Sequence, residues 1–489
     1  MMPDAQNRLA TSDGINRPRP GKDLLTTIAN CTRINGICQL TGNTFLVAAT
    51  VSGSAAWYSF NVVTGIATVL AGGPVFNTGN TVYMVQGLSA VYFCWQSLIW
   101  KWDGTTFTQV ATSPTQPNYD IVLYFTNRVM GIRHSTNIID VSKTLDDTVW
   151  DTINLSVQLD QFVQDSIVGA IPYQNFELIV FKNNATYLVD CNPANFVATP
   201  TPSIANFPIT IVTSVIGCCE HRTACQAGND VIFLSESGRG VFTVGQLLAN
   251  EQQAIKNPVS LPVKAYINRI NWSAIHRAHA VVWDDLYLLS VPLDGSTIPN
   301  FLLVFNISLQ TWQGLWTGYN SDDFTLQKYA GVETQFIWAS QTGGLYRHWY
   351  AADQVWADTV AGNIGTGVKF FSQLLCRGYR MGETFNKIQP FSWILEFTQS
   401  SDIVVAQLIA DTSNVGQSLN LQTFNSGVNL PLNLPFNLPS AGVVKQVVSA
   451  RPCGQCTEYQ IMLSGTGNWA ISQLSSQAWI ATGGNVVQQ

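Results

Sequence analysis

The chain has 489 residues, of which 46% are hydrophobic and 11% charged, and its formal net charge is −6. An average soluble domain has roughly 25% charged residues, and tight binding to a nucleic-acid backbone depends on clustered Lys and Arg, which this sequence lacks. The composition therefore argues against a freely diffusing cytoplasmic enzyme and against a charge-driven nucleic-acid-binding protein, and its 15 Trp, 24 Phe and 37 Gly favour sheet over helix.

Residues 1–30 contain Pro, Gly, Asn and charged residues without hydrophobic periodicity. We interpret them as an extended N-terminal arm, with a disordered tail as the alternative. No apolar run approaches the roughly 18 residues of a membrane span, and the polar N-terminus lacks the apolar core of a signal peptide. We therefore expect no membrane span. The 10 cysteines form no disulfide framework, which indicates synthesis in a reducing environment.

The clearest pattern lies in residues 82–110. Three short apolar strands at 82–85, 90–95 and 98–102 are closed by an Asp-Gly pair, and a fourth strand follows at 106–110. Asp-Gly after an apolar strand is a strong tight-turn signal, because Gly supplies the positive φ that the turn needs. Four antiparallel strands in about thirty residues have the size of a β-propeller blade.

The same signature, an aromatic apolar strand followed by a polar turn, recurs along residues 31–365. Its anchors are separated by 42, 37, 49, 54, 63 and 41 residues, close to the roughly 40–50 residues of known propeller blades. This predicts an all-β propeller with six to eight blades over residues 31–365. The anchors are Phe60, Trp102, Ile139, Leu188, Phe242, Phe305 and Tyr346.

Two segments depart from this pattern. Residues 245–256 have helical character and are followed by Pro258 and Pro262, which predicts one helix. Beyond residue 365 the expected strands are longer, at 369–380, 387–397 and 403–411, and they predict a C-terminal β-sandwich or platform domain over residues 366–489. The Asn/Leu/Pro-rich stretch 419–438 has too many prolines for a central strand and is expected to be a loop or edge ribbon.

Cysteine and histidine clusters are the candidates for metal binding. In the sequence CCEHRTAC, four soft ligands fall within eight residues, but adjacent cysteines rarely reach one ion together. A CxxC motif follows later without a second ligand pair at suitable spacing. We interpret both as structural and expect no metal and no cofactor. These residues are Cys218, Cys219, His221 and Cys225 in the first cluster, and Cys453 and Cys456 in the second.

Catalytic motifs are weak. His276 and His279 lie between a loop and a strand, without an HExxH motif, so they would not share a helix face. Three acidic pairs could suggest a glycosidase, in which two carboxylates flank the scissile bond. We place all three at turns, where Asp caps backbone amides, and expect no enzyme activity and no catalytic residues. The pairs are Asp146-Asp147, Asp284-Asp285 and Asp322-Asp323.

Four tryptophans keep an alternative open. Trp100, Trp102, Trp312 and Trp316 could stack on sugars, which would make the chain a carbohydrate-binding or carbohydrate-cleaving propeller. The competing interpretation is that these bulky side chains fill the spaces between blades.

The order of segments over roughly residues 120–465 resembles the tail hub or nozzle proteins of short-tailed bacteriophages, the packaged-DNA stabilisation protein family. The similarity includes residues 120–133 followed by 138–142, the strand pair at 165–190, and residues 212–217 followed by 230–237. The strand–turn–Trp step at 301–316 and the late strands at 369–411 complete it.

This resemblance implies a structural virion protein that assembles in the host cytoplasm into a hexameric ring below the portal and the tail adaptor. Such a ring forms the tail channel that retains packaged DNA and conducts it during ejection, and it holds tail fibres or spikes and a tail plug or needle. Six copies at −6 would carry −36, and an acidic channel lets double-stranded DNA pass without sticking.

Overall fold

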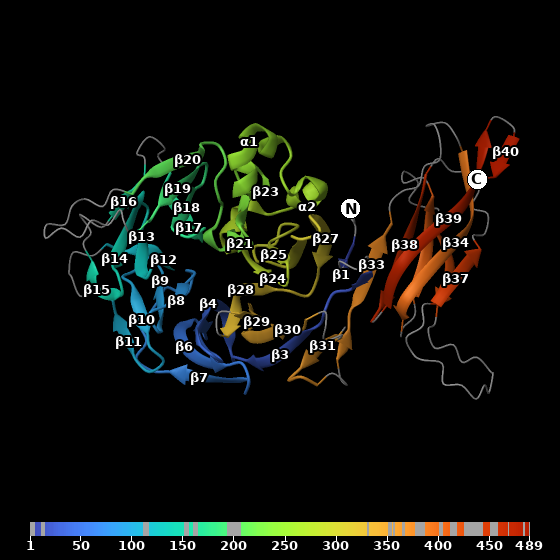
Figure 1. Ribbon diagram of the computed structural model, residues 1–489. Coiled ribbons are helices and arrows are strands. Elements are labelled where there is room, and N and C mark those ends of the chain that lie inside the picture. Colours follow the sequence, from blue (N-terminus) through green and yellow to red (C-terminus); the bar gives the residue numbers. More distant parts are fainter. Residues whose placement is uncertain are drawn as a thin grey trace. The chain divides into compact units, whose positions relative to one another are not determined.

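The computed structural model describes residues 5–10, 15–110, 117–150, 156–159, 165–192, 207–329, 332–350, 355, 357–363, 367–376, 387–400, 404–410, 418–424, 444–449, 458–467, 469–482 and 485–488 (Figure 1). It divides into two compact units. The propeller unit comprises Asp23–Leu302 and Gly318–His348, and the sandwich unit comprises Met1–Lys22, Leu303–Thr317 and Trp349–Gln489. The structure thus starts the second unit at Trp349, adds two earlier segments to it, and differs from the predicted division at residue 366.

Antiparallel sheets follow one another along the propeller unit. The first sheet contains β4 (Cys31–Thr41), β5 (Thr44–Val51), β6 (Ser54–Asn61) and β7 (Ile66–Leu70), and the second contains β8 (Tyr83–Gly87), β9 (Ala90–Cys94), β10 (Trp100–Trp102) and β11 (Phe107–Gln109). The third contains β12 (Tyr119–Phe125), β13 (Arg128–Arg133), β14 (Ile138–Lys143) and β15 (Asp146–Trp150), with β16 (Ser156–Gln158) paired to β14. The fourth contains β17 (Ile167–Tyr173), β18 (Glu177–Lys182), β19 (Thr186–Asp190) and β20 (Ile209–Thr213).

Three further sheets complete the propeller. The fifth is β21 (Cys225–Ala227), β22 (Asp230–Ser235) and β23 (Gly240–Thr243), and the sixth begins with β24 (His279–Trp283) and β25 (Leu286–Val291). The chain leaves the propeller unit within β26 (Phe301–Asn306). The seventh sheet contains β28 (Ser321–Tyr329), β29 (Val332–Ser340), β30 (Gly344–His348) and the N-terminal strand β3 (Lys22–Thr27).

The innermost strands close a ring. Contacts link β4 to β8, β8 to β12, β12 to β17, β17 to β21, β21 to β24, β24 to β28, and β28 back to β4. Seven sheets around one axis make this unit a seven-bladed β-propeller, as the repeat spacing predicted within its range of six to eight. Each anchor of the repeat lies on the third strand of its blade along the chain: β6, β10, β14, β19, β23, β26 and β30.

The core lies between neighbouring blades. All five residues of β9 are buried, because alternate side chains of this strand face different blades. Val91 and Phe93 pack with Trp57 of the first blade, whereas Tyr92 and Cys94 pack with residues of the third. This two-sided burial explains the near-continuous apolar runs in the sequence.

Strand β3 gives the N-terminal region a role that the predicted arm did not include. This strand, from the N-terminal part of the sequence, belongs to the sheet of the last blade and neighbours β30 in the sheet order. Arg347 pairs with the buried Asp23 at 2.9 Å, and the Ile28 amide donates to the carbonyl of Gly343. The first and last parts of the propeller sequence are thereby joined in one sheet, which closes the ring.

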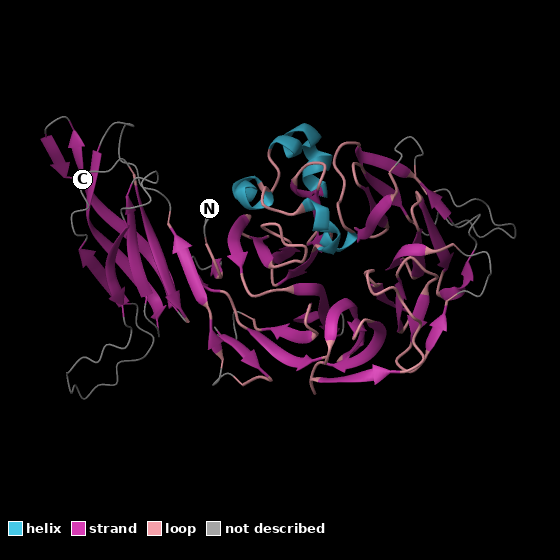
Figure 2. Ribbon diagram, turned by 180° about the vertical axis from the view of Figure 1, so that it is seen from behind, coloured by secondary structure: helices cyan, strands magenta, loops and turns pink. Residues whose placement is uncertain are grey.

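In the described part of the chain, the helices lie in the segments around the fifth and sixth blades (Figure 2). The helix predicted at 245–256 is confirmed as α1 (Val244–Lys256), whose N-terminus is capped by the Thr243 hydroxyl accepting from the Gln246 amide at 3.3 Å. The other helical elements are short: α2 (Lys264–Ile267), η2 (His221–Thr223), η3 (Leu261–Val263) and η4 (Trp272–Arg277). No helix within the described residues is long and apolar enough to span a membrane.

The sandwich unit contains two antiparallel sheets of long strands. One follows the order β1 (Arg8–Ala10), β2 (Asn16–Pro18), β39 (Trp469–Thr482), β34 (Lys387–Ser400) and β37 (Val444–Ser449), with β40 (Asn485–Gln488) on β39. The other follows β33 (Phe371–Leu375), β38 (Tyr459–Thr466), β35 (Val404–Ala410) and β36 (Ser418–Phe424). This unit also holds β27 (Thr311–Trp316), β31 (Ala357–Val360) and β32 (Val368–Lys369).

The N-terminal segment is part of this unit rather than an extended arm alone. Both β1 and β2 belong to the first of its sheets, and Gln6 forms a β-bridge with Gln373. Of the stretch 419–438, the described part forms β36, which stands at the end of its sheet order, and the remainder lies outside the described residues. Burial alternates along β38, as a strand with one covered face requires.

Candidate functional site

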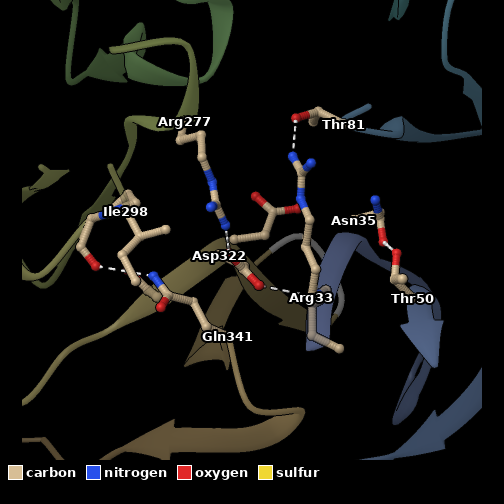
Figure 3. Close-up of polar contacts among 12 residues, drawn as sticks. Arg33, Asn35, Thr50, Thr81, Arg277, Ile298, Asp322 and Gln341 are labelled. Atoms are coloured by element: carbon tan, nitrogen blue, oxygen red, sulfur yellow. Dashed lines mark hydrogen bonds and ion pairs between the residues drawn. The ribbon is translucent and has the colours of Figure 1, made fainter. Parts of the chain in front are cut away.

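Charged side chains gather around the propeller axis. Asp322, on β28, accepts a hydrogen bond from the Ile34 amide of β4 at 2.8 Å and pairs with the guanidinium of Arg277 (Figure 3). The Asp322 carboxylate is almost fully buried and therefore depends on these partners, since an unpaired buried charge is costly. The pair joins the first, sixth and seventh blades.

A second group surrounds Arg222 of η2. Its guanidinium donates to the carbonyl of Asp322 at 3.1 Å and lies 3.5 Å from Glu220 and 3.6 Å from Asp323. Glu220 also accepts from the Tyr83 hydroxyl at 2.9 Å, and Asp323 accepts from the Ile37 amide at 3.1 Å. The inner strands β4, β8 and β28 are thus connected through one arginine.

Burial sets the charge states of this region. Desolvation raises the pKa of Asp323 to about 6 and lowers the pKa of His221 to about 4, with the positive charge of Arg222 a further cause for the histidine. Desolvation also holds the pKa of His279 well below its usual value. His279 contacts the Arg277 carbonyl at 3.0 Å and the Ser321 hydroxyl at 2.9 Å, which suits a neutral imidazole.

His221 lies unusually close to the fourth blade. A Cβ added to Gly169 of β17 would meet the Cα and Cβ of His221 at 2.9 Å, so a glycine is needed for this approach. The Nδ1 atom of His221 is buried without a hydrogen-bond partner among the described residues. This imidazole is therefore held by packing rather than by polar contacts.

Two cavities lie along the axis. The inner one, of about 230 Å³, is bordered by His221, Arg222 and Asp323. The outer one, of about 320 Å³, is bordered by residues at or just before the starts of the innermost strands, together with neighbouring loops. We call it the axial pocket, and its polar lining includes Arg33, Asn80, Tyr83, Gln96, Asp120 and His276.

The predicted cluster of soft ligands is brought together at one edge of the fifth blade as free thiols beside an imidazole. The Cys218 thiol donates to the Glu220 carbonyl at 3.1 Å, and burial raises its pKa to about 12. Burial likewise raises the pKa of Cys219 and Cys225. Within the described ranges, no three His, Cys, Asp or Glu side chains are grouped closely enough to hold a metal ion. Cys453 and Cys456 lie outside the described residues.

The acidic pairs have different positions. Asp284 and Asp285 have φ of 50° and 59° in a hairpin turn, as predicted. Asp146 and Asp147 instead begin strand β15 directly after a turn, where Asp146 accepts from the amide of Thr148 at 3.0 Å. The prediction of a turn is wrong for Asp322-Asp323, which begin strand β28 on the axis. Their carboxylates cap backbone amides of another blade, which local sequence cannot reveal.

Asp147 and the two histidines also have identifiable roles. Asp147 accepts from the Tyr92 hydroxyl and the Lys101 ammonium, both at 2.7 Å, and so binds the second blade to the third. His276 ends up exposed in η4, whereas His279 is buried at the start of β24. The two do not lie on one helix face, as the sequence indicated.

The tryptophans that were considered for sugar stacking are mostly buried. Trp102, Trp312 and Trp316 are 1%, 3% and 0% exposed, and Trp100 packs on the core between the first two blades. Trp316 donates its indole N–H to the Arg8 carbonyl at 2.9 Å. These side chains therefore take part in core packing, which was the competing interpretation, rather than in sugar stacking.

Sequence reasoning missed the residues that connect the blades at the axis. Arg33, Arg222, Arg277, Glu220 and Tyr83 were not singled out, because they are scattered over four blades. A usable signal was present, since charged residues beside apolar strand starts stand out in a chain with only 11% charged residues. Only the closed ring makes them neighbours.

Comparisons with known proteins identify no family for this chain. No protein-family model and no curated protein matches the chain. Among solved structures, the Pan2 WD40 domain of Neurospora crassa is similar at 10% identity and a TM-score of 0.40, over 65% of this chain and 89% of that one. BamB from Moraxella catarrhalis is similar at 11% identity and a TM-score of 0.38, over 71% and 96%. An exo-β-1,3-galactanase from Phanerochaete chrysosporium with galactose is similar at 10% identity and a TM-score of 0.28, over 95% and 100%.

Proposed function

We propose that the protein is a structural virion protein, the ring-forming tail nozzle or hub of a short-tailed bacteriophage. In this role a hexameric ring lies below the portal and tail adaptor, retains packaged DNA and conducts it during ejection. The order of strand pairs resembles that family, and an all-β propeller with a second β-rich unit is compatible with it.

The observation that supports an assembly most directly is an apolar outer edge on the first blade. β7 stands last in its sheet order, and exposed aliphatic side chains lie on it and beside it. A strand edge with exposed apolar side chains invites pairing with another chain unless it is covered. The exposed fractions are 72% for Val63, 59% for Ile66, 65% for Val69 and 85% for Val75.

The fourth blade repeats this feature. β20 also stands last in its sheet order. The exposed fractions on it and beside it are 38% for Ile209, 55% for Ile211 and 50% for Val215. A subunit with two such edges can contact two neighbours through different surfaces, which is what a closed ring requires. The low content of charged residues fits surfaces that are covered in an assembly.

Charge is compatible with a DNA conduit. The net charge of −6 per chain is repeated in every copy of a ring, and an acidic wall repels the phosphate backbone. The ring would bind the tail adaptor, fibres or spikes, and a plug or needle, after assembly in the host cytoplasm.

The proposal is tested by antibody labelling of intact phage particles from the source culture, viewed by negative-stain electron microscopy. We expect label confined to the tail vertex. Bare particles, together with recovery of the protein only as a free monomer, would overturn the proposal.

The apolar edge is tested separately. We expect the double variant Ile66→Lys/Val69→Lys to lose ring formation in light scattering, because two buried charges would oppose association. Thr68→Lys is the matched control on the same strand, since Thr68 is already polar and exposed. Equal assembly of both variants would contradict a role for this edge.

A further inference from the structure

The axial pocket contains a cation whose hydrogen-bonding capacity is incompletely used. Arg33, at the start of β4, donates through its terminal nitrogens to the Gly79 carbonyl and to the Thr81 hydroxyl, the latter at 3.2 Å (Figure 3). Its Nε is buried without a hydrogen-bond partner among the described residues, so a ligand could contact only the two terminal nitrogens, each of which has a second N–H. Both contacts are to neutral oxygens, in contrast to the carboxylates that meet Arg222 and Arg277.

The acids that border the same pocket are already engaged. Asp120 accepts from His134 Nδ1 at 2.7 Å and from the Ser135 amide at 3.1 Å. Glu220 accepts from the Tyr83 hydroxyl and lies against Arg222. Both carboxylates are thus occupied by other groups, and the remaining terminal N–H groups of the half-buried Arg33 guanidinium favour an anion from outside.

The potential on this side of the pocket is positive. Desolvation and then the charges of Arg277, Arg33 and Arg222 lower the pKa of His276, whose imidazole is exposed beside Arg33 in the pocket lining. A neutral imidazole can donate to or accept from a ligand hydroxyl. The surroundings thus combine one attractive cation with neutral hydrogen-bonding groups.

The remaining lining determines the class of ligand. Asn80, Gln96, Thr81 and Ser135 bring amides and hydroxyls that can bond to several hydroxyl groups. A volume of about 320 Å³ is at the lower end of the range of small-molecule sites and suits a single sugar ring rather than a chain.

We propose that the axial pocket binds one unit of a sugar acid, with its carboxylate on Arg33 and its hydroxyls on the surrounding polar groups. This site is distinct from the buried tryptophans and does not depend on ring assembly. It gives the propeller a small-molecule recognition function beyond the proposed structural role.

Isothermal titration calorimetry of the full chain with sodium glucuronate tests the proposal, with glucose and sodium acetate as probes of the hydroxyl and charge contributions alone. We expect glucuronate to bind at least about tenfold more tightly than either probe, because charged and neutral contacts act together. No heat from glucuronate, or equal affinity for acetate or glucose, would overturn the sugar-acid assignment.

Two variants locate the site. Arg33→Gln should weaken glucuronate binding by about tenfold or more, because one charge-assisted hydrogen bond is lost. Arg269→Gln is the matched control, since Arg269 is an exposed arginine that pairs with Asp294 at 2.7 Å away from the pocket lining. His276→Ala, at an exposed position, gives a second reading if Arg33→Gln fails to fold, and should weaken binding severalfold. Unchanged affinity in folded Arg33→Gln or in His276→Ala, or equal loss in Arg269→Gln, would overturn the site.

Discussion

Arg277 of the propeller unit and Arg8 of the sandwich unit are stabilised in different ways. In the propeller, Arg277 meets the carboxylate of Asp322, which also caps a backbone amide of a third blade. In the sandwich unit, the fully buried Arg8 donates to Asn16 and to the Trp469 carbonyl at 3.0 Å, and its guanidinium lies 3.8 Å from the Trp469 ring centroid.

The difference follows from how each unit is closed. Propeller blades are complete sheets that must be linked at their inner ends, and an ion pair between strands provides a specific link. The sandwich unit instead depends on an N-terminal segment that enters its sheet. Arg8 stacks on an aromatic ring and fixes that segment at one point. Buried Arg19 fixes the same segment at another point through an ion pair with Asp358 at 3.1 Å. Ion pairs thus stabilise each of the two units, and the aromatic stacking of Arg8 is what the axial pair of the propeller lacks.

The largest effect is expected from Asp322→Ala in the propeller. Removal of this carboxylate leaves Arg277 and the Ile34 amide without their partner, which should lower the free energy of unfolding by about 3–5 kcal/mol. Urea unfolding followed by tryptophan fluorescence measures the loss. Asp294→Ala, which breaks the exposed pair with Arg269, should cost less than about 1 kcal/mol. Similar losses of unfolding free energy in both variants would show that the Asp322–Arg277 pair stabilises the protein no more than an exposed pair does.

A smaller effect is expected from Arg8→Ala in the sandwich unit. The buried acceptors of Asn16 and Trp469 lose their donor, at a cost of about 3 kcal/mol or less. Hydrogen exchange should show faster opening of β39 while the propeller strands keep their protection. Arg8→Met should recover part of the loss, because an apolar side chain of similar length restores packing. Uniform loss of protection in both units would contradict their separate closure.

The smallest effect is a pH dependence in the propeller. The pKa of His221 is about 4 in the folded protein and about 6.5 when unfolded, so the unfolded chain binds the extra proton between these values. Stability therefore rises with pH from 4 to 6.5, by about 2 kcal/mol from this group. Asp323, with its pKa raised to about 6, acts in the opposite direction between pH 4 and 6.

His221→Gln isolates the contribution of the histidine. Relative to the wild type, the change in stability between pH 4.5 and 6.5 should decrease in the variant by the contribution of His221, while His279, also held neutral by burial, and Asp323 keep their own contributions. Thermal unfolding at these two pH values measures the difference. An unchanged pH profile in the variant would show that His221 is accessible to protons in the folded state.

The local sequence pattern was sufficient to predict the blade repeat, but it was insufficient to predict how the N-terminal strands complete the sheets. The anchors Phe60, Trp102 and Ile139 lie on third strands because a blade repeats the same alternation of apolar strand and turn. The N-terminal residues 1–30 had no periodicity of their own, since β3 and β1 gain their order from sheets formed by distant strands.

The sequence by itself determined the all-β class, the spacing of the blades, the helix at 244–256 and the burial of many aromatic side chains, because these depend on short-range alternation and turn chemistry. The tertiary structure alone decided the number of blades, the contacts of Asp322 with Arg277, and the meeting of Arg33 with His276 around one pocket. These features depend on the packing of blades around the axis, which brings together residues 45 positions apart in the case of Asp322 and Arg277 and more than 200 apart in the case of Arg33 and His276, and no local pattern encodes such contacts.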